Sequence, residues 1–157
     1  MKKSLIFGMV AVLLLPLLVI GCKEEEPAAP EMPALNGGQE AVLIEISCDD
    51  FMAQNHMTRD VQLIRPGSLI VSLCSNPTTG FQWAEAENSN PSAVLEVSHN
   101  FVEPQATGEP VVGAPSKDVW VFDSQNPGSA TVKMSYGRPW EGGEKDEWTL
   151  TLNITVK

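Results

Sequence analysis

The feature that most constrains this chain is a strict alternation of apolar and polar residues, which recurs throughout the chain after residue 39. In the last such segment the apolar members are Trp148, Leu150, Leu152, Ile154 and Val156. A period of two places these residues on one face of an extended strand and the intervening polar residues on the other. The pattern therefore predicts half-buried β-strands, and the one helix candidate is a short turn around Asp50–Met57.

Runs of this kind are separated by turn signals such as Arg65-Pro66-Gly67 and Asn126-Pro127-Gly128, where proline and glycine favour a reversal of the chain. The runs are Val42–Cys48, Val61–Arg65, Leu69–Leu73, Phe81–Ala86, Val94–Val102, Asp118–Asp123, Ala130–Tyr136 and Trp148–Val156. About eight short strands in one domain's length predict an all-β fold, namely an antiparallel β-sandwich of two sheets. A β-barrel is the alternative.

The first residues carry a different pattern, which is typical of export. A basic start precedes the nearly continuous apolar run Leu5–Ile20, which is short for a membrane-spanning helix. The run ends in Leu18–Cys22, a stretch that resembles a bacterial lipobox, where the cysteine becomes lipid-modified and N-terminal. We expect residues 1–21 to be a lipoprotein signal peptide and Cys22 to be lipidated. An ordinary signal peptide or an uncleaved anchor is the alternative.

Residues 22–38 have the composition of a tether, and residues 39–157 have the length of one domain. The tether is rich in glutamate, proline and alanine and has almost nothing to bury, so we expect it to be disordered. We expect the protein to be anchored by lipid to the cell membrane or outer membrane, with its domain facing the periplasm or the exterior. A net charge of −10 argues against nucleic acid and against adsorption to anionic lipid.

Two cysteines remain once Cys22 is assigned to the lipid. An exported compartment favours a disulfide between Cys48 and Cys74 over two free thiols. The period-two pattern alone does not bring the two together. Cys48 is in phase with the apolar residues of its run, and Cys74 is out of phase with those of its run. A bulge or a strand end is needed to reconcile them.

Two rigid loops follow strand-like runs about sixty residues apart. In Asn76–Phe81, the asparagine side chain is expected to cap a turn, Pro77 fixes φ, and Gly80 permits φ > 0. In the second loop, Pro139 stiffens the chain beside Arg138 and Trp140, which are residue types enriched in binding hot spots. The alternatives are a purely structural turn for the first loop and, for Trp140, a lid folded onto the end of the sandwich.

These two loops resemble those of the chagasin family of cysteine-protease inhibitors, over about Arg59–Lys157. Asn76-Pro77-Thr78-Thr79-Gly80-Phe81, followed by Trp83, is similar to the family's first inhibitory loop, and Tyr136-Gly137-Arg138-Pro139-Trp140 is similar to its third. The counterpart of the glycine-rich middle loop is Val112-Gly113-Ala114-Pro115-Ser116.

The resemblance implies an immunoglobulin-like sandwich with three loops at one end. It also implies reversible, competitive inhibition of papain-like cysteine proteases by a monomer. The Asn76–Phe81 loop would enter the catalytic cleft. The middle loop (Gly113, Ala114, Pro115 and Ser116) and the third loop (Arg138, Pro139 and Trp140) would flank the cleft as clamps.

Two other function classes stay open. One is a surface module that binds carbohydrate or another cell-surface ligand, with Trp120 and Trp140 as stacking platforms. The other is an enzyme, whose candidate nucleophiles are the two cysteines. A disulfide would remove both thiols, so we expect no enzymatic activity.

The candidate bases for a cysteine nucleophile are the two histidines, His56 and His99. Acidic clusters at Asp49-Asp50 and at Glu144, Asp146 and Glu147 lack the spacing of a calcium loop. We therefore expect neither a metal site nor a cofactor.

Overall fold

The structure is a computed structural model that describes residues 40–104 and 115–157. The predicted signal peptide and tether, residues 1–38, lie outside the described residues, as does residue 39 of the predicted domain. Within the described ranges, no helix combines the length and the apolar content needed to span a bilayer.

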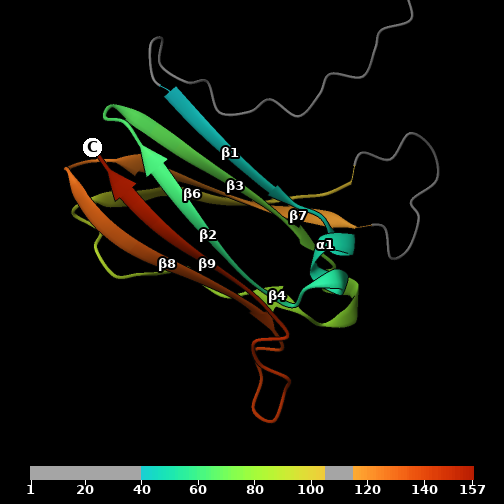
Figure 1. Ribbon diagram of the computed structural model, residues 1–157. Helices are drawn as coiled ribbons and strands as arrows, with labels where there is room; N and C mark the ends of the chain where they lie inside the picture. The colour runs from blue at the N-terminus through green and yellow to red at the C-terminus, as the bar shows by residue number, and fades with distance from the viewer. Residues whose placement is uncertain (1–39, 105–114) are drawn as a thin grey trace, which may run out of the picture. The chain divides into compact units, whose positions relative to one another are not determined.

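Two β-sheets pack face to face and form a sandwich (Figure 1). The first has the strand order β1 (Glu40–Ile46), β3 (Gly67–Ser75), β7 (Ser116–Ser124) and β6 (Val94–Val102). The second has the order β2 (His56–Leu63), β9 (Trp148–Val156), β8 (Gly128–Gly137) and β4 (Gln82–Trp83), and the short β5 (Glu87–Asn88) also pairs with β8. The predicted all-β sandwich is confirmed, and the described strands do not close into a barrel.

The expectation of purely antiparallel sheets is wrong at two strand pairs. β1 pairs in parallel with β3, and β2 pairs in parallel with β9. The turn signals favour reversals of the chain between the strand runs. Instead, helix α1 (Cys48–Ala53) carries the chain from the edge of one sheet to the edge of the other. Each of the first two strands therefore pairs with a strand that is distant in the sequence.

The strand boundaries follow the alternation closely in the long strands. β6 and β9 have the predicted limits, whereas the run Phe81–Ala86 forms only the two-residue strand β4. The helix candidate at Asp50–Met57 is confirmed as α1, which lies slightly earlier in the chain. It begins at Cys48 because Ser47 and Asp50 form a capping box that satisfies backbone N–H groups of the first turn.

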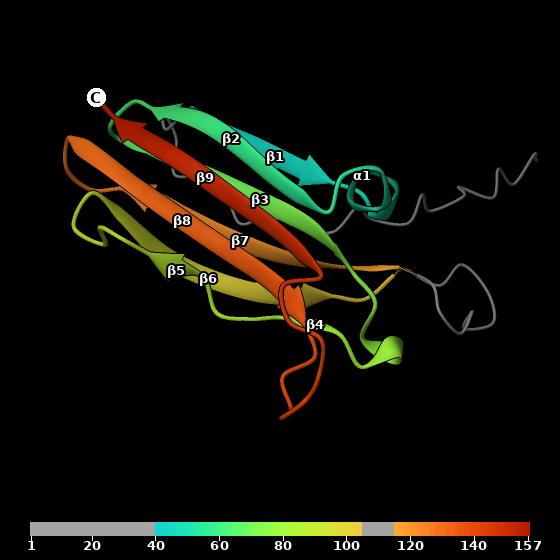
Figure 2. The same cartoon turned by 60° about the horizontal axis from the view of Figure 1, so that its bottom comes forward.

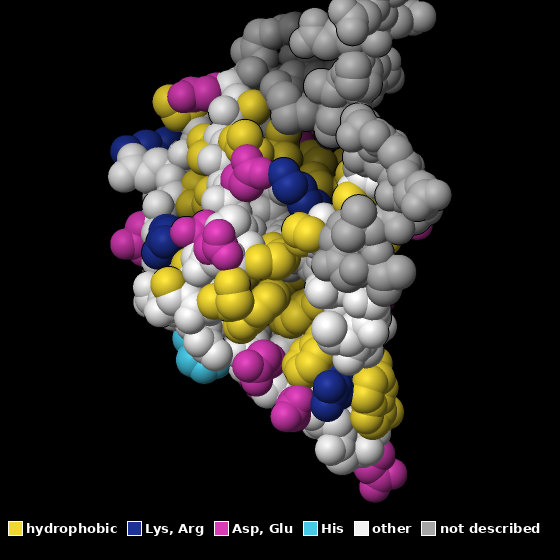
Figure 3. Space-filling view, turned by 90° about the vertical axis from the view of Figure 1, so that its right-hand side faces the viewer, with side chains coloured by type: hydrophobic (Ala, Val, Ile, Leu, Met, Phe, Trp, Pro, Cys, Tyr) yellow, Lys and Arg dark blue, Asp and Glu magenta, His cyan; other side chains and the backbone are white. Residues whose placement is uncertain are grey.

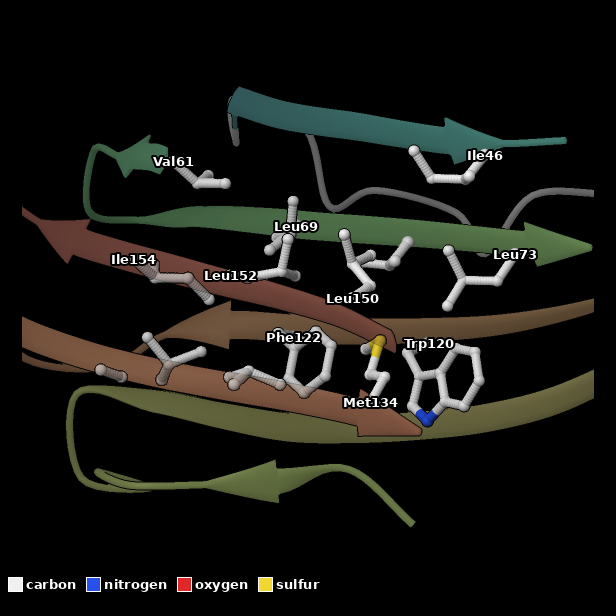
Figure 4. Close-up of a cluster of buried hydrophobic side chains, with 14 of the residues drawn as sticks. Ile46, Val61, Leu69, Leu73, Trp120, Phe122, Met134, Leu150, Leu152 and Ile154 are labelled. Atoms are coloured by element: carbon white, nitrogen blue, oxygen red, sulfur yellow. The ribbon is translucent and has the colours of Figure 1, made fainter. Parts of the chain in front are cut away.

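The core lies between the two sheets and is built from the apolar positions of the alternation (Figure 4). Leu69, Leu73 and Trp120 of the first sheet face Leu150 and Leu152 of the second, and all five are fully buried. Trp120, whose placement the sequence left open, is a core residue. At one end, aromatic rings extend this core. They are Phe51, Trp83, Tyr136 and Trp148, whose ring centroids lie about 5 Å apart along the series.

Strand directions bring four connections to the same end of the sandwich, which we call the loop end (Figure 2). β3 and its parallel neighbour β1 both finish there, and β9 and its parallel neighbour β2 both start there. The connections at the loop end are 47–55, 76–81, 103–115 and 138–147. The opposite end, called the far end, carries the turns 64–66, 89–93 and 125–127.

Candidate functional site

Loop 1, the segment Asn76–Phe81, holds its own shape through local hydrogen bonds. Pro77–Thr79 form a single turn of 3₁₀ helix, and Gly80 closes it with φ of 80°, as the sequence predicted. The Thr79 hydroxyl donates to the Asn76 carbonyl oxygen at 2.7 Å. Pro77, Thr78 and Thr79 are exposed, so the tip of the loop is both ordered and accessible.

The Asn76 side chain does not act in the way the sequence suggested. It makes no capping hydrogen bond to a backbone N–H group of the turn. Instead its Oδ1 accepts a hydrogen bond from the Thr78 hydroxyl at 2.6 Å. The Thr79 N–H, which a capping side chain would bind, bonds instead to the Asn76 carbonyl oxygen at 3.3 Å. The side-chain bond still ties the asparagine to the tip of the loop.

Loop 1 is fixed to the scaffold at its base by two buried side chains. The Tyr136 hydroxyl accepts a hydrogen bond from the Asn76 backbone N–H at 2.8 Å. The Trp83 indole N–H donates to the Cys74 carbonyl oxygen at 2.9 Å. Burial raises the pKa of Tyr136, so its hydroxyl stays protonated at neutral pH. Each of the two buried side chains thus has a polar partner at the base of loop 1, as buried polar groups generally do.

Loop 3, the segment 138–147, is a hairpin connection between β8 and β9 that is held by its own charges. The Arg138 guanidinium lies 3.1 Å from the Glu144 carboxylate. The backbone N–H of Arg138 donates to the backbone carbonyl oxygen of Glu144 at 2.7 Å. The Lys145 ammonium donates to the Trp140 carbonyl oxygen at 3.0 Å. These bonds order the loop, and they leave the Trp140 side chain 51% exposed, as the sequence predicted.

Loops 1 and 3 touch each other at the loop end. The Arg138 guanidinium lies over the Phe81 ring, 4.5 Å from its centroid, which is close enough for a cation–π interaction. A Cβ atom placed on Gly80 would come within 2.7 Å of the Trp140 indole ring, so the ring edge lies directly against the loop 1 glycine. The two loops that the sequence singled out therefore form one continuous surface.

The middle loop is described only where it ends. Gly113 and Ala114 lie outside the described residues, and Pro115 is exposed. Ser116 is not part of the exposed loop, contrary to the prediction, because β7 begins there. Its buried hydroxyl donates to the Ser75 carbonyl oxygen at 3.0 Å. Ser116 thus joins the base of the middle loop to the base of loop 1.

The two cysteines form the predicted disulfide, with a Cα–Cα distance of 5.1 Å. Their phase mismatch is explained by Cys48, which is the first residue of α1 rather than part of a strand. The bond removes both candidate nucleophiles of the enzyme hypothesis. His99 instead lies against Asp118, with 2.7 Å between Nε2 and the carboxylate, and His56 contacts Thr149.

The acidic clusters serve as local structural groups. Hydrogen bonding from Ser47 holds the pKa of Asp50 below its usual range. Hydrogen bonding from Ser135, followed by the charge of Lys133, does the same for the pKa of Asp146. Across the residues that the structure describes, no three His, Cys, Asp or Glu side chains are grouped to hold a metal ion.

Sequence reasoning missed the contacts that support the loops. Tyr136 looked like an ordinary inward-facing strand residue, and its hydroxyl was the only signal of a polar partner. The helix candidate was placed around Asp50–Met57, and the capping pair Ser47 and Asp50 could have identified its true start at Cys48. The carbohydrate hypothesis loses one of its two platforms, because Trp120 is fully buried.

The fold and the site define a class of protein: a β-sandwich that presents ordered, mutually supported loops from one end. The chain belongs to the chagasin family of peptidase inhibitors, since residues 66–154 match the family described as Chagasin family peptidase inhibitor I42. Membership confirms the predicted family and makes this chain a peptidase inhibitor rather than an enzyme.

One curated relative and two solved structures are among the proteins that are similar to this chain. Amoebiasin-2 of Entamoeba histolytica is 26% identical over 87 residues, which cover 55% of this chain and 68% of the relative. The crystal structure of the cysteine protease inhibitor EhICP2 from Entamoeba histolytica shares the fold at 22% identity. Its TM-score is 0.57, and the match covers 76% of this chain and all of that one. PbICP-C in complex with falcipain-2 is 18% identical, with a TM-score of 0.46 over 75% of this chain and 99% of that one.

Proposed function

We propose that the chain is a reversible, competitive inhibitor of papain-like cysteine proteases. In this proposal Asn76–Phe81 enters the catalytic cleft and covers the active-site thiol. The middle loop (Gly113–Ser116) and the third loop (Arg138–Trp140) lie on either side of the cleft, although Ser116 acts as an anchor rather than as a contact.

The observation that carries the proposal is the order of loop 1 at an exposed tip. Binding costs free energy when flexible segments must be fixed, and each immobilised side chain costs about 0.5–1.5 kcal/mol. Here the turn is closed by Gly80, the base is bonded to Tyr136, and one side is covered by Trp140. A loop that is ordered before binding avoids most of that cost.

The same geometry is suited to inhibition rather than to cleavage. A protease must align a scissile carbonyl with its thiol in a near-attack arrangement. Residues Pro77–Thr79 are coiled in a 3₁₀ turn, closed by the hydrogen bond from Gly80 N–H to the Pro77 carbonyl. A coiled segment does not present an extended peptide to the thiol, so the loop occupies the cleft without becoming a substrate.

A protease–inhibitor interface of typical size buries about 1,600 Å² in total, which requires more than one loop in contact. Figure 3 shows the side of the molecule that is on the right in Figure 1, where apolar side chains are exposed among acidic and basic ones. The interfaces of non-obligate complexes are likewise a mixture of apolar and polar groups.

The proposal includes the setting of the inhibitor. We propose that residues 1–21 are removed as a signal peptide and that Cys22 is lipidated. The tether of residues 22–38 would then hold a monomeric inhibitor domain near the membrane surface, facing the periplasm or the exterior.

The experiment is an inhibition titration. The full chain, purified in detergent, is titrated against papain and a cathepsin-like protease with a small peptide substrate. We expect competitive inhibition that is reversed on dilution. Absence of inhibition at micromolar concentration would overturn the proposal. A glycan-binding assay run in parallel tests the carbohydrate alternative, which predicts glycan binding without inhibition.

The variant Trp140→Ala tests the role of the third loop in the same assay. We expect it to weaken inhibition and to leave the melting temperature almost unchanged, because half of the side chain is exposed. A large fall in melting temperature with intact inhibition would instead identify Trp140 as a structural lid.

A further inference from the structure

A fourth connection, residues 47–55 with helix α1, shares the loop end with the three loops. The family match begins at residue 66, so this connection lies outside it. α1 is placed by topology, because β1 finishes and β2 starts at the loop end. In Figure 2, α1 emerges on the same side of the sandwich as the 3₁₀ turn of loop 1.

The fourth connection is attached to the bases of the other loops. The Cys48–Cys74 disulfide joins it to β3 two residues before Asn76. Past the helix, the Asn55 carbonyl oxygen accepts a hydrogen bond from Thr149 N–H at 2.9 Å, next to the end of loop 3. On the remaining side, a recess of about 350 Å³ separates Ser47, Cys48 and Asp49 from Pro115–Lys117 at the end of the middle loop.

The helix is also rigid, although it is only six residues long. The Asp50 N–H donates to the Ser47 hydroxyl at 3.1 Å, and the Asp50 carboxylate accepts from the Ser47 N–H at 2.9 Å. Phe51 is fully buried and stacks on Trp148, with the ring centroids 5.0 Å apart. A short helix held in this way keeps its exposed side chains in fixed positions.

The outward side of α1 carries an apolar side chain beside a carboxylate. Met52 is 67% exposed, which is more than any other large hydrophobic residue in the described part of the chain. Asp49 is exposed next to it and makes no ion pair or side-chain hydrogen bond with another described residue. Met is unbranched and polarisable, so it adapts to apolar surfaces of varied shape.

Position distinguishes Met52 from the other exposed hydrophobic residues. Single exposed apolar residues are common and need no explanation. Among the large exposed hydrophobic residues described, only Met52 and Trp140 stand on connections of the loop end. The remaining ones lie on strands or at the far end, and they are Leu43, Ile64, Leu95, Val97 and Phe101.

We propose that α1 is a fourth protease-binding element. Met52 packs against an apolar side chain on the rim of the protease cleft, and Asp49 faces a basic group beside it. This inference rests on the proposed function, since it names the same partner. It adds a contact from the N-terminal segment to the three loops that carry the family resemblance.

The test compares two matched substitutions at opposite ends of the sandwich. Met52→Glu places a charge on the proposed contact. Ile64→Glu places the same charge on a residue that is 58% exposed at the far end. The full chain with each substitution is titrated against papain and the cathepsin-like protease, with Trp140→Ala as a reference. We expect Met52→Glu to weaken inhibition by roughly tenfold or more, because a buried interfacial charge without a partner is unfavourable. Ile64→Glu is expected to leave inhibition unchanged.

The outcomes separate this inference from the proposed function. If the unmodified chain does not inhibit, the proposed function fails. If the chain inhibits and Trp140→Ala weakens it, but Met52→Glu behaves like Ile64→Glu, only the fourth element is overturned. Melting temperatures of both glutamate variants should stay close to that of the unmodified chain, because both side chains are exposed. A fall confined to Met52→Glu would mean that Met52 supports α1 and is not a contact, which also overturns the inference.

Discussion

The two ends of the sandwich are ordered by different means. At the far end, turns are closed by backbone hydrogen bonds, such as Gln125 N–H to the Ala93 carbonyl at 2.8 Å, and by small polar side chains, such as the Asn126 amide that donates to the Ser92 carbonyl at 2.7 Å. At the loop end, buried aromatic side chains and a disulfide are added to the backbone bonds: the Tyr136 hydroxyl, the Trp83 indole and Cys48–Cys74.

This difference matters because a buried aromatic side chain or a disulfide has no equivalent in another residue type, so most substitutions there lose the contact. The shape of the loop end therefore depends on the identity of a few residues. The far end provides matched positions at which the same kind of substitution should leave inhibition unaffected. Comparing variants at the two ends separates effects on inhibition from effects on stability.

The largest effect on stability is expected from Phe51→Ala. Phe51 is fully buried and fills the space between Trp83 and Trp148 at the loop end. Removing a buried aromatic side chain costs about 3–5 kcal/mol, because the cavity is only partly refilled. Urea unfolding of the full chain measures the loss, and inhibition should weaken as α1 and loop 1 lose their support.

The control is Phe101→Ala on β6, where the phenylalanine is 47% exposed. We expect it to cost far less than Phe51→Ala and to leave inhibition intact. If the two variants lose similar amounts of unfolding free energy, the aromatic series at the loop end does not support the fold in the way described.

A smaller effect on stability and a clear effect on inhibition are expected from Gly80→Val. Valine at φ of 80° is strained, and its Cβ would come within 2.7 Å of the Trp140 ring. The substitution should both deform loop 1 and displace Trp140. If these residues are binding hot spots, a loss of about 2 kcal/mol, or roughly 30-fold in the inhibition constant, follows.

Gly128→Val is the matched control at the far end. Its φ is 152°, and a Cβ atom added there would have the Ala93 Cβ as its nearest neighbour at 3.6 Å, which is ordinary contact. We expect a loss of stability with unchanged inhibition. If Gly80→Val inhibits as strongly as the unmodified chain, the contact between loops 1 and 3 does not contribute to binding.

Local features of the loop end were predictable from the sequence. The positive φ of Gly80 depends on the residues next to it in the sequence. The exposure of Trp140 likewise depends on its own sequence neighbours. The alternation likewise predicted the long strands and the buried faces of β8 and β9, but not that β3 is buried on both faces and β6 is mostly exposed. The predicted disulfide is present. The phase mismatch between its two cysteines disappears because Cys48 lies at the start of a helix and not in a strand.

Features that join distant parts of the chain were not predictable. The parallel pairing of β1 with β3 depends on where α1 directs the chain, and no local signal encodes that direction. The bond from Asn76 to Tyr136 spans 60 residues. Ser116 was predicted as a contact because it continues the middle loop in sequence. It is buried at the start of β7, where its hydroxyl donates to the Ser75 carbonyl oxygen of the neighbouring strand. Only the register of the two strands shows that these residues lie opposite each other.

The smallest effect is a pH dependence that should arise from the capping box at the start of α1. The Ser47 hydrogen bonds hold the pKa of Asp50 below its ordinary value of 3.8. A carboxyl group with a lowered pKa stabilises the folded state above the unfolded pKa, and this contribution is lost as the pH falls through the folded pKa. The far-end backbone hydrogen bonds described above do not titrate, so they add no such dependence.

Asp50→Ala should therefore lower the melting temperature slightly at about pH 7, and the difference from the unmodified chain should shrink below about pH 3.8. Asp49→Ala removes a neighbouring exposed carboxylate that is outside the capping box, so it controls for the lost charge. Thermal unfolding of the three chains across this pH range is the measurement. If Asp49→Ala and Asp50→Ala respond to pH in the same way, net charge rather than the capping box orders the start of α1. The rigidity assigned to Met52 would then need another source.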